Sequence, residues 1–233
     1  GGSLQLKEII MIYSDAFVWL HFPKCAGTKI ESLFKKYYSS HSGIVQDFTG
    51  FNVFGVNMYL FGTKKKPLGS WHDSILQREA RDSKFLLEDR VVICSFRRLP
   101  SWLESRYNYE YKRNPKLKHC PDRLLEGKFL EHNGFENHAD RYAMKYFPQS
   151  ILESGRLRFI RTEHFESDFK TVFGDYVDVT IIPDSEFNNK INASKSCLPP
   201  DFREKFYAEQ KSLYELCPYW KAVEEMAYGM TFH

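Results

Sequence analysis

The sequence has few cysteines, and none of them is placed as in a cross-linked or metal-binding fold. Its five cysteines include no Cys-x-x-Cys pair and no Cys/His spacing of the kind that binds zinc. An odd number also argues against a framework of disulfides. These absences exclude a small disulfide-stabilised domain and a zinc module. They favour a reducing compartment, so we expect a cytoplasmic protein.

Long apolar runs and a strong excess of one charge are also missing. No stretch reaches the roughly 18 apolar residues of a membrane-spanning helix, since polar residues interrupt the best candidate at 9–22. No signal peptide is recognisable, and Gly1-Gly2-Ser3 is typical of a cloning remnant, so we expect residues 1–10 to be such a remnant or flexible. The net charge of only +3 does not indicate a partner among nucleic acids.

The sequence does contain enough apolar material for one sizeable domain spanning residues 1–233, since 42% of its residues are hydrophobic and 16% aromatic. Short apolar runs alternate with stretches of helical periodicity, which predicts a three-layer α/β fold with a central, mostly parallel sheet flanked by helices. Strands are expected at Ala16–Phe22, Val91–Phe96, Leu157–Ile160 and Val177–Ile182. Helices are expected at Thr28–Tyr38, Ser74–Leu87, Pro100–Tyr111, Phe135–Phe147, Glu163–Phe173, Pro200–Leu216 and Tyr219–Tyr228.

The turn after the first predicted strand carries groups that suit an anion. It reads His21-Phe22-Pro23-Lys24-Cys25-Ala26-Gly27-Thr28-Lys29 and leads into a predicted helix. The first N–H groups of a helix have no intrahelical acceptor and lie at the positive end of its dipole. Gly27 allows close approach of the backbone, the Thr28 hydroxyl can donate, and Lys24 adds a movable positive charge. An ordinary strand–turn–helix connection remains an equal interpretation of this turn alone.

A second turn of the same kind follows the strand at 91–96. Arg97 stands at the strand end, and Ser105 lies eight residues later, about two helical turns into the next helix. An arginine fork with a hydroxyl suits a phosphate monoester. Because ligands of parallel sheets bind at the carboxyl ends of the strands, both turns are expected at one site.

Together the two turns resemble the motifs of the sulfotransferases that use 3′-phosphoadenosine-5′-phosphosulfate (PAPS). The first family motif, commonly HxPKxGGT, binds the 5′-phosphosulfate, and residues 21–28 are similar to it apart from Cys25 and Ala26. The second motif binds the 3′-phosphate through an arginine at a strand end and a serine eight residues later, as in Arg97 and Ser105. The order Leu99-Pro100 departs from the usual Arg-Asp-Pro.

Two weaker similarities follow in the order expected for the family. Residues 159–165 resemble its third strand with an "RTExL" ending, and residues 192–195 resemble a polar loop that closes over the nucleotide. The residues that the resemblance assigns to the nucleotide are Lys24, Cys25, Ala26, Gly27, Thr28, Lys29, Arg97, Ser105, Thr162, Ser194 and Lys195.

The resemblance implies transfer of a sulfuryl group from PAPS to a hydroxyl or amine of a small-molecule, lipid or carbohydrate acceptor. The product nucleotide is 3′,5′-bisphosphoadenosine (PAP), and no metal is needed. Lys24 is expected to stabilise the leaving phosphate oxygen, and His72 is the candidate general base, because many relatives carry the base near this position. His21 is expected to be part of the scaffold. Segments 46–75 and 108–138 are expected to shape the acceptor pocket.

Two alternatives remain open. A P-loop-type kinase of small molecules or nucleotides would need a Gly-Lys-Ser/Thr sequence after the first strand and an acidic magnesium ligand at another strand end. The second strand instead ends Ser95-Phe96-Arg97. A non-catalytic nucleotide-binding module of the same fold is the other alternative, and the presence of both Lys24 and Arg97 argues against it.

Overall fold

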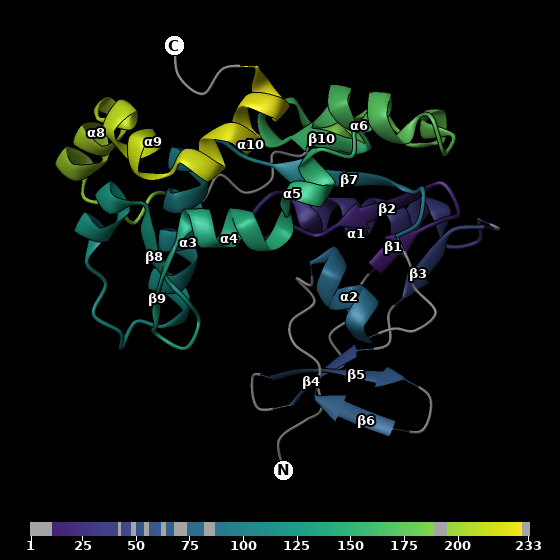
Figure 1. The fold of residues 1–233 in the computed structure, drawn as a ribbon, viewed down its shortest axis with the longest axis horizontal. Helices are drawn as coiled ribbons and strands as arrows, with labels where there is room; N and C mark the ends of the chain where they lie inside the picture. Colours follow the sequence, from purple (N-terminus) through teal and green to yellow (C-terminus); the bar gives the residue numbers. More distant parts are fainter. Residues whose placement is uncertain are drawn as a thin grey trace. The chain divides into compact units, whose positions relative to one another are not determined.

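A computed structural model describes the chain over residues 11–41, 43–47, 50–53, 56–61, 64–67, 74–81, 87–188 and 195–229. The chain forms two compact units, and each combines three separate stretches of sequence (Figure 1). The first unit contains Gly1–Ser95, Arg156–Ile160 and His164–Asn189. The second contains Phe96–Gly155, Arg161–Glu163 and Lys190–His233.

The first unit is built on a five-stranded sheet in the order β10-β7-β2-β1-β3. Its strands are β1 (Met11–Tyr13), β2 (Phe17–Leu20), β3 (Val45–Asp47), β7 (Val91–Phe96) and β10 (Leu157–Arg161). β2 and β7 are parallel neighbours, with Leu20 opposite Cys94. β1 runs antiparallel to both β2 and β3, so β3 points the same way as β2. The mixed α/β fold with a mostly parallel sheet agrees with the prediction from the sequence.

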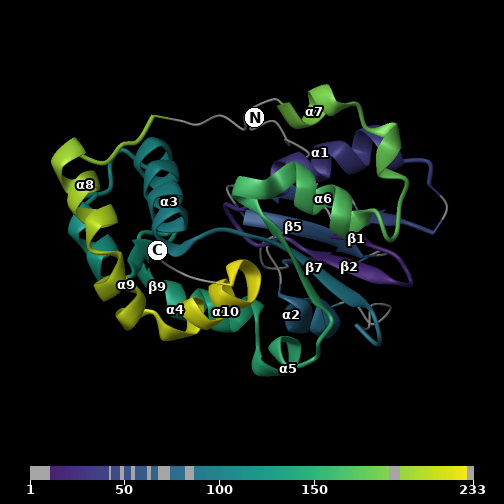
Figure 2. The same ribbon diagram turned by 90° about the horizontal axis from the view of Figure 1, so that it is seen from above.

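Helices flank this sheet because its central strands are apolar on both faces. All four residues of β2 are buried, as expected for a parallel strand covered on two sides. Figure 2 shows α1 (Gly27–Tyr38) and α6 (Phe165–Phe173) on one side and α2 (Ile75–Arg81) on the other. The apolar face of α1 packs with α6, where the rings of Phe34 and Phe173 have centroids 4.9 Å apart.

A three-stranded antiparallel sheet lies within the segment expected to shape the acceptor pocket. It consists of β4 (Gly50–Val53), β5 (Val56–Phe61) and β6 (Lys64–Pro67) in that order. The sequence did not predict these strands, because its glycines at 50, 55, 62 and 69 divide the segment into pieces too short to show a clear period.

The second unit is mostly helical and has an aromatic core. Trp102 of α3 (Leu99–Arg113) packs against Trp220 of α10 (Pro218–Tyr228), with ring centroids 4.8 Å apart. Phe129 meets Trp102 edge-on at 5.0 Å. The other elements described here are η1 (Pro121–Glu126), β8 (Lys128–Leu130), β9 (Glu136–His138), α4 (Ala139–Tyr146), α5 (Gln149–Leu152), η2 (Thr162–His164), α8 (Pro200–Ala208) and α9 (Gln210–Leu216).

The prediction of a strand at Val177–Ile182 is wrong. Residues Val179–Ile181 form the short 3₁₀ helix η3, which precedes α7 (Asp184–Asn188). The Asp178 carboxylate accepts a hydrogen bond from the N–H of Thr180 at 3.0 Å and thereby starts the turn. This local side-chain bond competes successfully with the β preference of the neighbouring branched residues.

Several predicted helices also have different bounds, among them α2, which spans Ile75–Arg81, and α6, which begins at Phe165. The helix expected from Phe135 begins only at Ala139, because Glu136–His138 pair with β8 and the His138 ring accepts the N–H of Asp140 at 3.1 Å. The helix expected over 200–216 is divided at Glu209 into α8 and α9. Within the described ranges, no helix has both the length and the apolar character needed to cross a membrane.

Candidate anion-binding site

The turn between β2 and α1 has a strained backbone. Lys24 and Ala26 both adopt a positive φ, of 62° and 61°, which costs a non-glycine residue about 1–3 kcal/mol. Left-handed residues within such a turn can direct neighbouring N–H groups to one side and so form an anion-binding nest. The Ala26 carbonyl accepts hydrogen bonds from the N–H groups of Lys29 and Ile30 at 3.1 and 3.3 Å, which starts the helix.

The N-terminus of α1 has the donors for an anion and lacks a competing carboxylate in its first turn. No side chain of the described residues caps the helix, and no acidic residue occurs in its first turn. The N–H groups of Gly27 and Thr28 have no intrahelical acceptor because of their position in the helix. Thr28 is exposed and Lys24 is half-buried. Backbone donors, a hydroxyl and an ammonium group together fit a phosphate or sulfate ester.

The side chains of Cys25 and Lys29 differ in their surroundings. The Cys25 side chain is fully buried. The Lys29 ammonium donates to the carbonyl of Phe187 at 3.3 Å and lies 5.1 Å from the centroid of the Phe165 ring. Burial lowers the pKa of Lys29 although two nearby glutamates oppose the change. The Lys29 side chain is thus directed toward α6 and α7, and its expected contact with a nucleotide stays a prediction.

His21 lies between the end of β2 and the first turn of α1. Its ring stacks on Trp19 with centroids 4.9 Å apart, and its Nδ1 lies 3.2 Å from Oε1 of Glu31. A Cβ atom on Gly27 would lie 1.9 Å from Nε2 of His21. Burial lowers the pKa of His21 to about 4 and raises the pKa of Glu31 to about 7. Sequence reasoning missed Glu31, although its position one helical turn after Gly27 was a usable signal.

Arg97 directly follows β7, the parallel neighbour of β2, and belongs to the second unit. Its Nε atom is buried and has no hydrogen-bond partner among the described residues. Burial and the bond to Glu104 raise the pKa of Tyr207, while the charge of Arg97 opposes the rise. Arg97 is therefore a cation near Tyr207, with a buried donor available for an acceptor atom.

Arg98, next in the chain, has a structural role instead. Its Nη1 atom lies 3.4 Å from Oε2 of the buried Glu224, and its guanidinium carbon lies 4.3 Å from the centroid of the Tyr228 ring. The same Glu224 carboxylate accepts the N–H of Leu99 at 2.7 Å. The N-terminus of α3 is thus already occupied by a carboxylate, so its anion-binding capacity is used within the protein.

Ser105 is half-buried on α3, next to a polar network in the second unit. The buried Glu104 accepts from Nε of Arg203 at 2.7 Å and from the hydroxyl of Tyr207. Burial alone would raise the pKa of Glu104, but hydrogen bonds from Arg203, Ser196 and Tyr207 outweigh burial and lower it. Lys195, which precedes Ser196 in the chain, is exposed.

Thr162, His72 and Ser194 are the remaining residues of the expected site. Thr162 is half-buried and begins η2 immediately after β10. His72 and Ser194 lie outside the described residues. In segment 108–138, the exposed ring of Tyr111 lies 5.2 Å from the ring of His119, at the end of α3.

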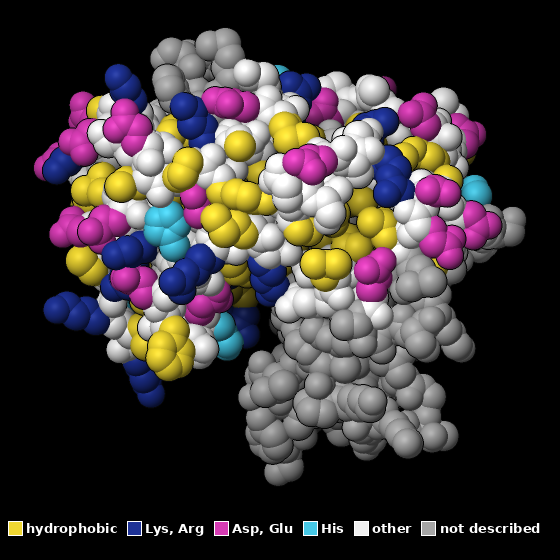
Figure 3. Space-filling view, viewed as in Figure 1, with side chains coloured by type: hydrophobic (Ala, Val, Ile, Leu, Met, Phe, Trp, Pro, Cys, Tyr) yellow, Lys and Arg dark blue, Asp and Glu magenta, His cyan; other side chains and the backbone are white. Residues whose placement is uncertain are grey.

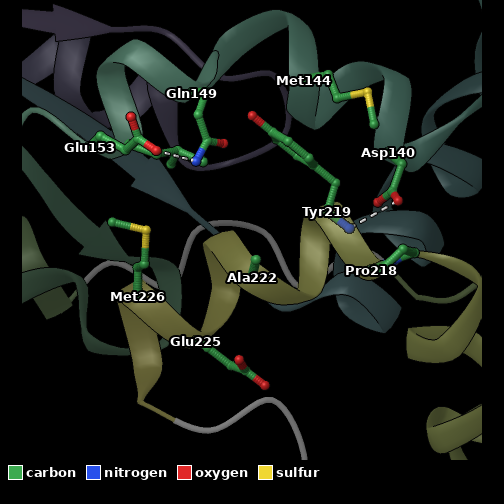
Figure 4. Close-up of a pocket in the computed structure, with 10 residues that line it drawn as sticks. Asp140, Met144, Gln149, Glu153, Pro218, Tyr219, Ala222, Glu225 and Met226 are labelled. Carbon is green, nitrogen blue, oxygen red and sulfur yellow. Dashed lines mark hydrogen bonds between the residues drawn. The ribbon is translucent and has the colours of Figure 1, made fainter.

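A separate open pocket in the second unit is a poor candidate for an anionic nucleotide. It is bounded by α4, α5 and α10, and Figure 4 shows its lining residues. Its lining combines apolar side chains with Asp140, Glu153 and Glu225, and no lysine or arginine lines it. Asp140 uses its carboxylate to accept the N–H groups of Tyr219 and Trp220 at 3.0 and 2.7 Å.

Basic and acidic side chains are interspersed over the face of the molecule in Figure 3, in keeping with the small net charge. Within the part of the chain that the structure describes, no group of three or more His, Cys, Asp or Glu side chains is arranged to hold a metal ion. Comparisons with known proteins give no matching family model, no matching curated protein and no matching solved structure. The sulfotransferase resemblance therefore depends on the motifs and their geometry.

Proposed function

We propose that this chain is a PAPS-dependent sulfotransferase that acts on a hydroxyl or amine of a small-molecule, lipid or carbohydrate acceptor. The observation that carries the proposal is the turn 24–28. Two non-glycine residues there hold left-handed conformations at a helix N-terminus without a side-chain cap among the described residues. Its sequence is similar to the family motif that binds the 5′-phosphosulfate. The odd number of cysteines and their lack of paired spacing support a cytoplasmic location.

In the proposed reaction, the chain binds the donor and stabilises the charge that develops as the sulfuryl group leaves. PAPS supplies the sulfuryl group when it is bound. The acceptor oxygen or nitrogen forms a bond to sulfur while the bond between sulfur and the bridging phosphate oxygen breaks. Lys24 and the N–H groups of Gly27 and Thr28 stabilise the negative charge on that oxygen. His72 takes the acceptor proton.

The 3′-phosphate is assigned to the second motif. Arg97 supplies the guanidinium, and its unpartnered Nε supports the assignment. Ser105 supplies a hydroxyl, while Thr162, Ser194 and Lys195 complete the nucleotide contacts. This division gives the two motifs separate tasks, so variants of each should have different kinetic effects.

The direct test is binding of PAP by calorimetry, together with transfer from labelled PAPS to a panel of hydroxylated and amine acceptors. Lys24→Ala should abolish measurable transfer while largely retaining PAP affinity, because its charge is needed mainly in the transition state. Loss of PAP binding with unchanged turnover of bound PAPS would contradict this role.

Arg97→Ala should weaken PAP binding by about 2–5 kcal/mol, because it removes one partner of the charge pair between the guanidinium and the 3′-phosphate. The same substitution should leave the affinity for adenosine 5′-phosphosulfate unchanged, because that nucleotide lacks the 3′-phosphate. Arg113→Ala is a matched control, since Arg113 is an exposed arginine at the far end of α3. An equal loss of affinity for both nucleotides would show that Arg97 does not contact the 3′-phosphate.

The same assays distinguish the alternatives. PAP binding without transfer to any acceptor would indicate a non-catalytic module. Magnesium-dependent ATP hydrolysis without PAP binding would indicate a kinase. If PAP neither bound the folded chain nor raised its melting temperature, the sulfotransferase proposal would be wrong.

A further inference from the structure

His21 and Glu31 form a pair at the helix end that we assign to the phosphosulfate. Their side chains are only 14% and 21% exposed, and Nδ1 lies 3.2 Å from Oε1. A histidine oriented by a carboxylate is a common arrangement for a general base. Here the other ring nitrogen, Nε2, lies so close to Gly27 that even a methyl group there would overlap with it at 1.9 Å. No acceptor can enter that space, so the pair is not suited to proton transfer from substrate.

The pair instead connects two elements of the first unit. The His21 ring stacks on Trp19 of β2, with an interplanar angle of 22°. On its other sides it meets Gly27 and Glu31, which lie one turn apart on α1. The ring therefore fixes the separation between the end of β2 and the first turn of α1.

We propose that His21 and Glu31 are positioning residues that hold the N–H groups of Gly27 and Thr28 in the orientation required by the donor nucleotide. This inference rests on the proposed function, because it concerns the same anion site. The backbone of the turn is strained at Lys24 and Ala26. Such a conformation persists only when the surrounding contacts determine it, and the His21 ring, stacked on Trp19 and 3.2 Å from Glu31, is such a contact.

The close fit between His21 and Gly27 gives the proposal a specific experimental signature. Gly27→Ala should lower both the melting temperature and the affinity for PAP, because its Cβ overlaps with the ring. In a His21→Ala background, the same Gly27→Ala change should lower the melting temperature little, because the space is then open. PAP affinity should remain low in the double variant, since the positioning ring is still missing. If the double variant recovers stability but not PAP affinity, the His21 ring positions the turn for the nucleotide and does not only fill space.

Glu31 provides a second test that does not create a large cavity at the turn. Glu31→Ala should weaken PAP binding about tenfold or more through misplacement of the ring. Glu31→Gln retains the shape and a polar end group, so it should restore PAP affinity to within about threefold of the original value, or about 0.7 kcal/mol. Glu186→Ala is the matched control, because Glu186 contacts α1 at Lys36 and Tyr37, near its other end.

Calorimetry with PAP, run beside thermal unfolding of each variant, distinguishes the possible failures. If the unmodified chain binds PAP and both His21→Ala and Glu31→Ala bind it equally well, the positioning role is wrong and the proposed function stands. If Glu31→Gln is as impaired as Glu31→Ala, the contact with Nδ1 is not what matters and the role is again wrong. If the unmodified chain binds neither PAP nor PAPS, both proposals fail together.

Discussion

Glu224 offers a sharp stability test, because it is a fully buried carboxyl with three different partners. It accepts the N–H of Leu99 at 2.7 Å and the hydroxyl of Tyr214 at 2.6 and 2.8 Å, and Arg98 lies 3.4 Å away. Leu99 begins α3 only two residues after Arg97. Glu224 therefore holds the segment of backbone that carries the proposed phosphate-binding arginine.

Glu224→Ala should lower the free energy of unfolding by about 3–5 kcal/mol. The truncation leaves the N–H of Leu99 and the hydroxyl of Tyr214 without their acceptor in a buried place, and each such loss costs about 1–3 kcal/mol. Arg98 is 26% exposed and can exchange its partner for water. Glu224→Gln keeps an acceptor oxygen and the same volume, so its cost near pH 5 should be about 1 kcal/mol.

The two variants should also differ in their dependence on pH. Burial raises the pKa of Glu224 from 4.5 to about 7, although its hydrogen bonds and Arg98 oppose the change. The folded protein therefore binds a proton more tightly than the unfolded chain, and this stabilisation is lost as the pH rises from 4.5 through 7. The raised pKa of Glu224 therefore contributes about 3 kcal/mol to the free energy of unfolding at low pH.

Urea denaturation at pH 5 and pH 8 tests this reasoning. The glutamine variant does not ionise, so its stability relative to the original protein should improve by about 3 kcal/mol between these pH values. Glu31 has its own pKa raised in the same direction, and its contribution cancels because both proteins retain it. A difference between the two proteins that stays constant with pH would refute the argument. So would a glutamine variant as unstable as the alanine variant.

Three further predictions concern the second unit and the reaction. In thermal unfolding, Gly127→Ala should lower the melting temperature far more than Gly155→Ala. Both glycines have a positive φ, but a Cβ at 127 would lie 2.3 Å from Sγ of Cys217, whereas a Cβ at 155 would meet nothing within 4 Å. Ser105→Ala should weaken PAP binding by about 1 kcal/mol in calorimetry, without affecting adenosine 5′-phosphosulfate. His72→Ala should slow transfer from labelled PAPS about 10²–10⁴-fold and leave PAP affinity unchanged.

The hydrophobic pattern predicted the parts of the fold that are dominated by burial. The strands at 17–20 and 91–96 are short, β-rich and buried on both faces, so their sequence alone identifies them. Val177–Ile182 has a similar composition, yet the side chain of Asp178 decides its conformation through a local hydrogen bond. The three-residue strands β1 and β3 are too short to show a period, and their pairing depends on contacts distant in sequence.

For the site, the spacing of the motifs identified the turn but not the contacts around it. The sequence shows that Lys24 precedes Gly27 in a strand–turn–helix connection. It does not show that Lys29 turns toward Phe187, because that direction depends on how α7 packs against α1. The meeting of His21 with Glu31 likewise requires the tight turn between them, whose backbone conformation the residue types do not reveal.

The division of the chain into alternating stretches has a practical consequence for dissecting it. Each compact unit draws on three separate stretches of sequence, and the short stretch Arg156–Ile160 supplies an edge strand to a sheet begun far upstream. No single cut therefore separates the two units, because any fragment that keeps one of them whole also carries part of the other. A truncated form would carry an incomplete unit beside a whole one, so the roles of its residues are best separated by single substitutions in the intact chain.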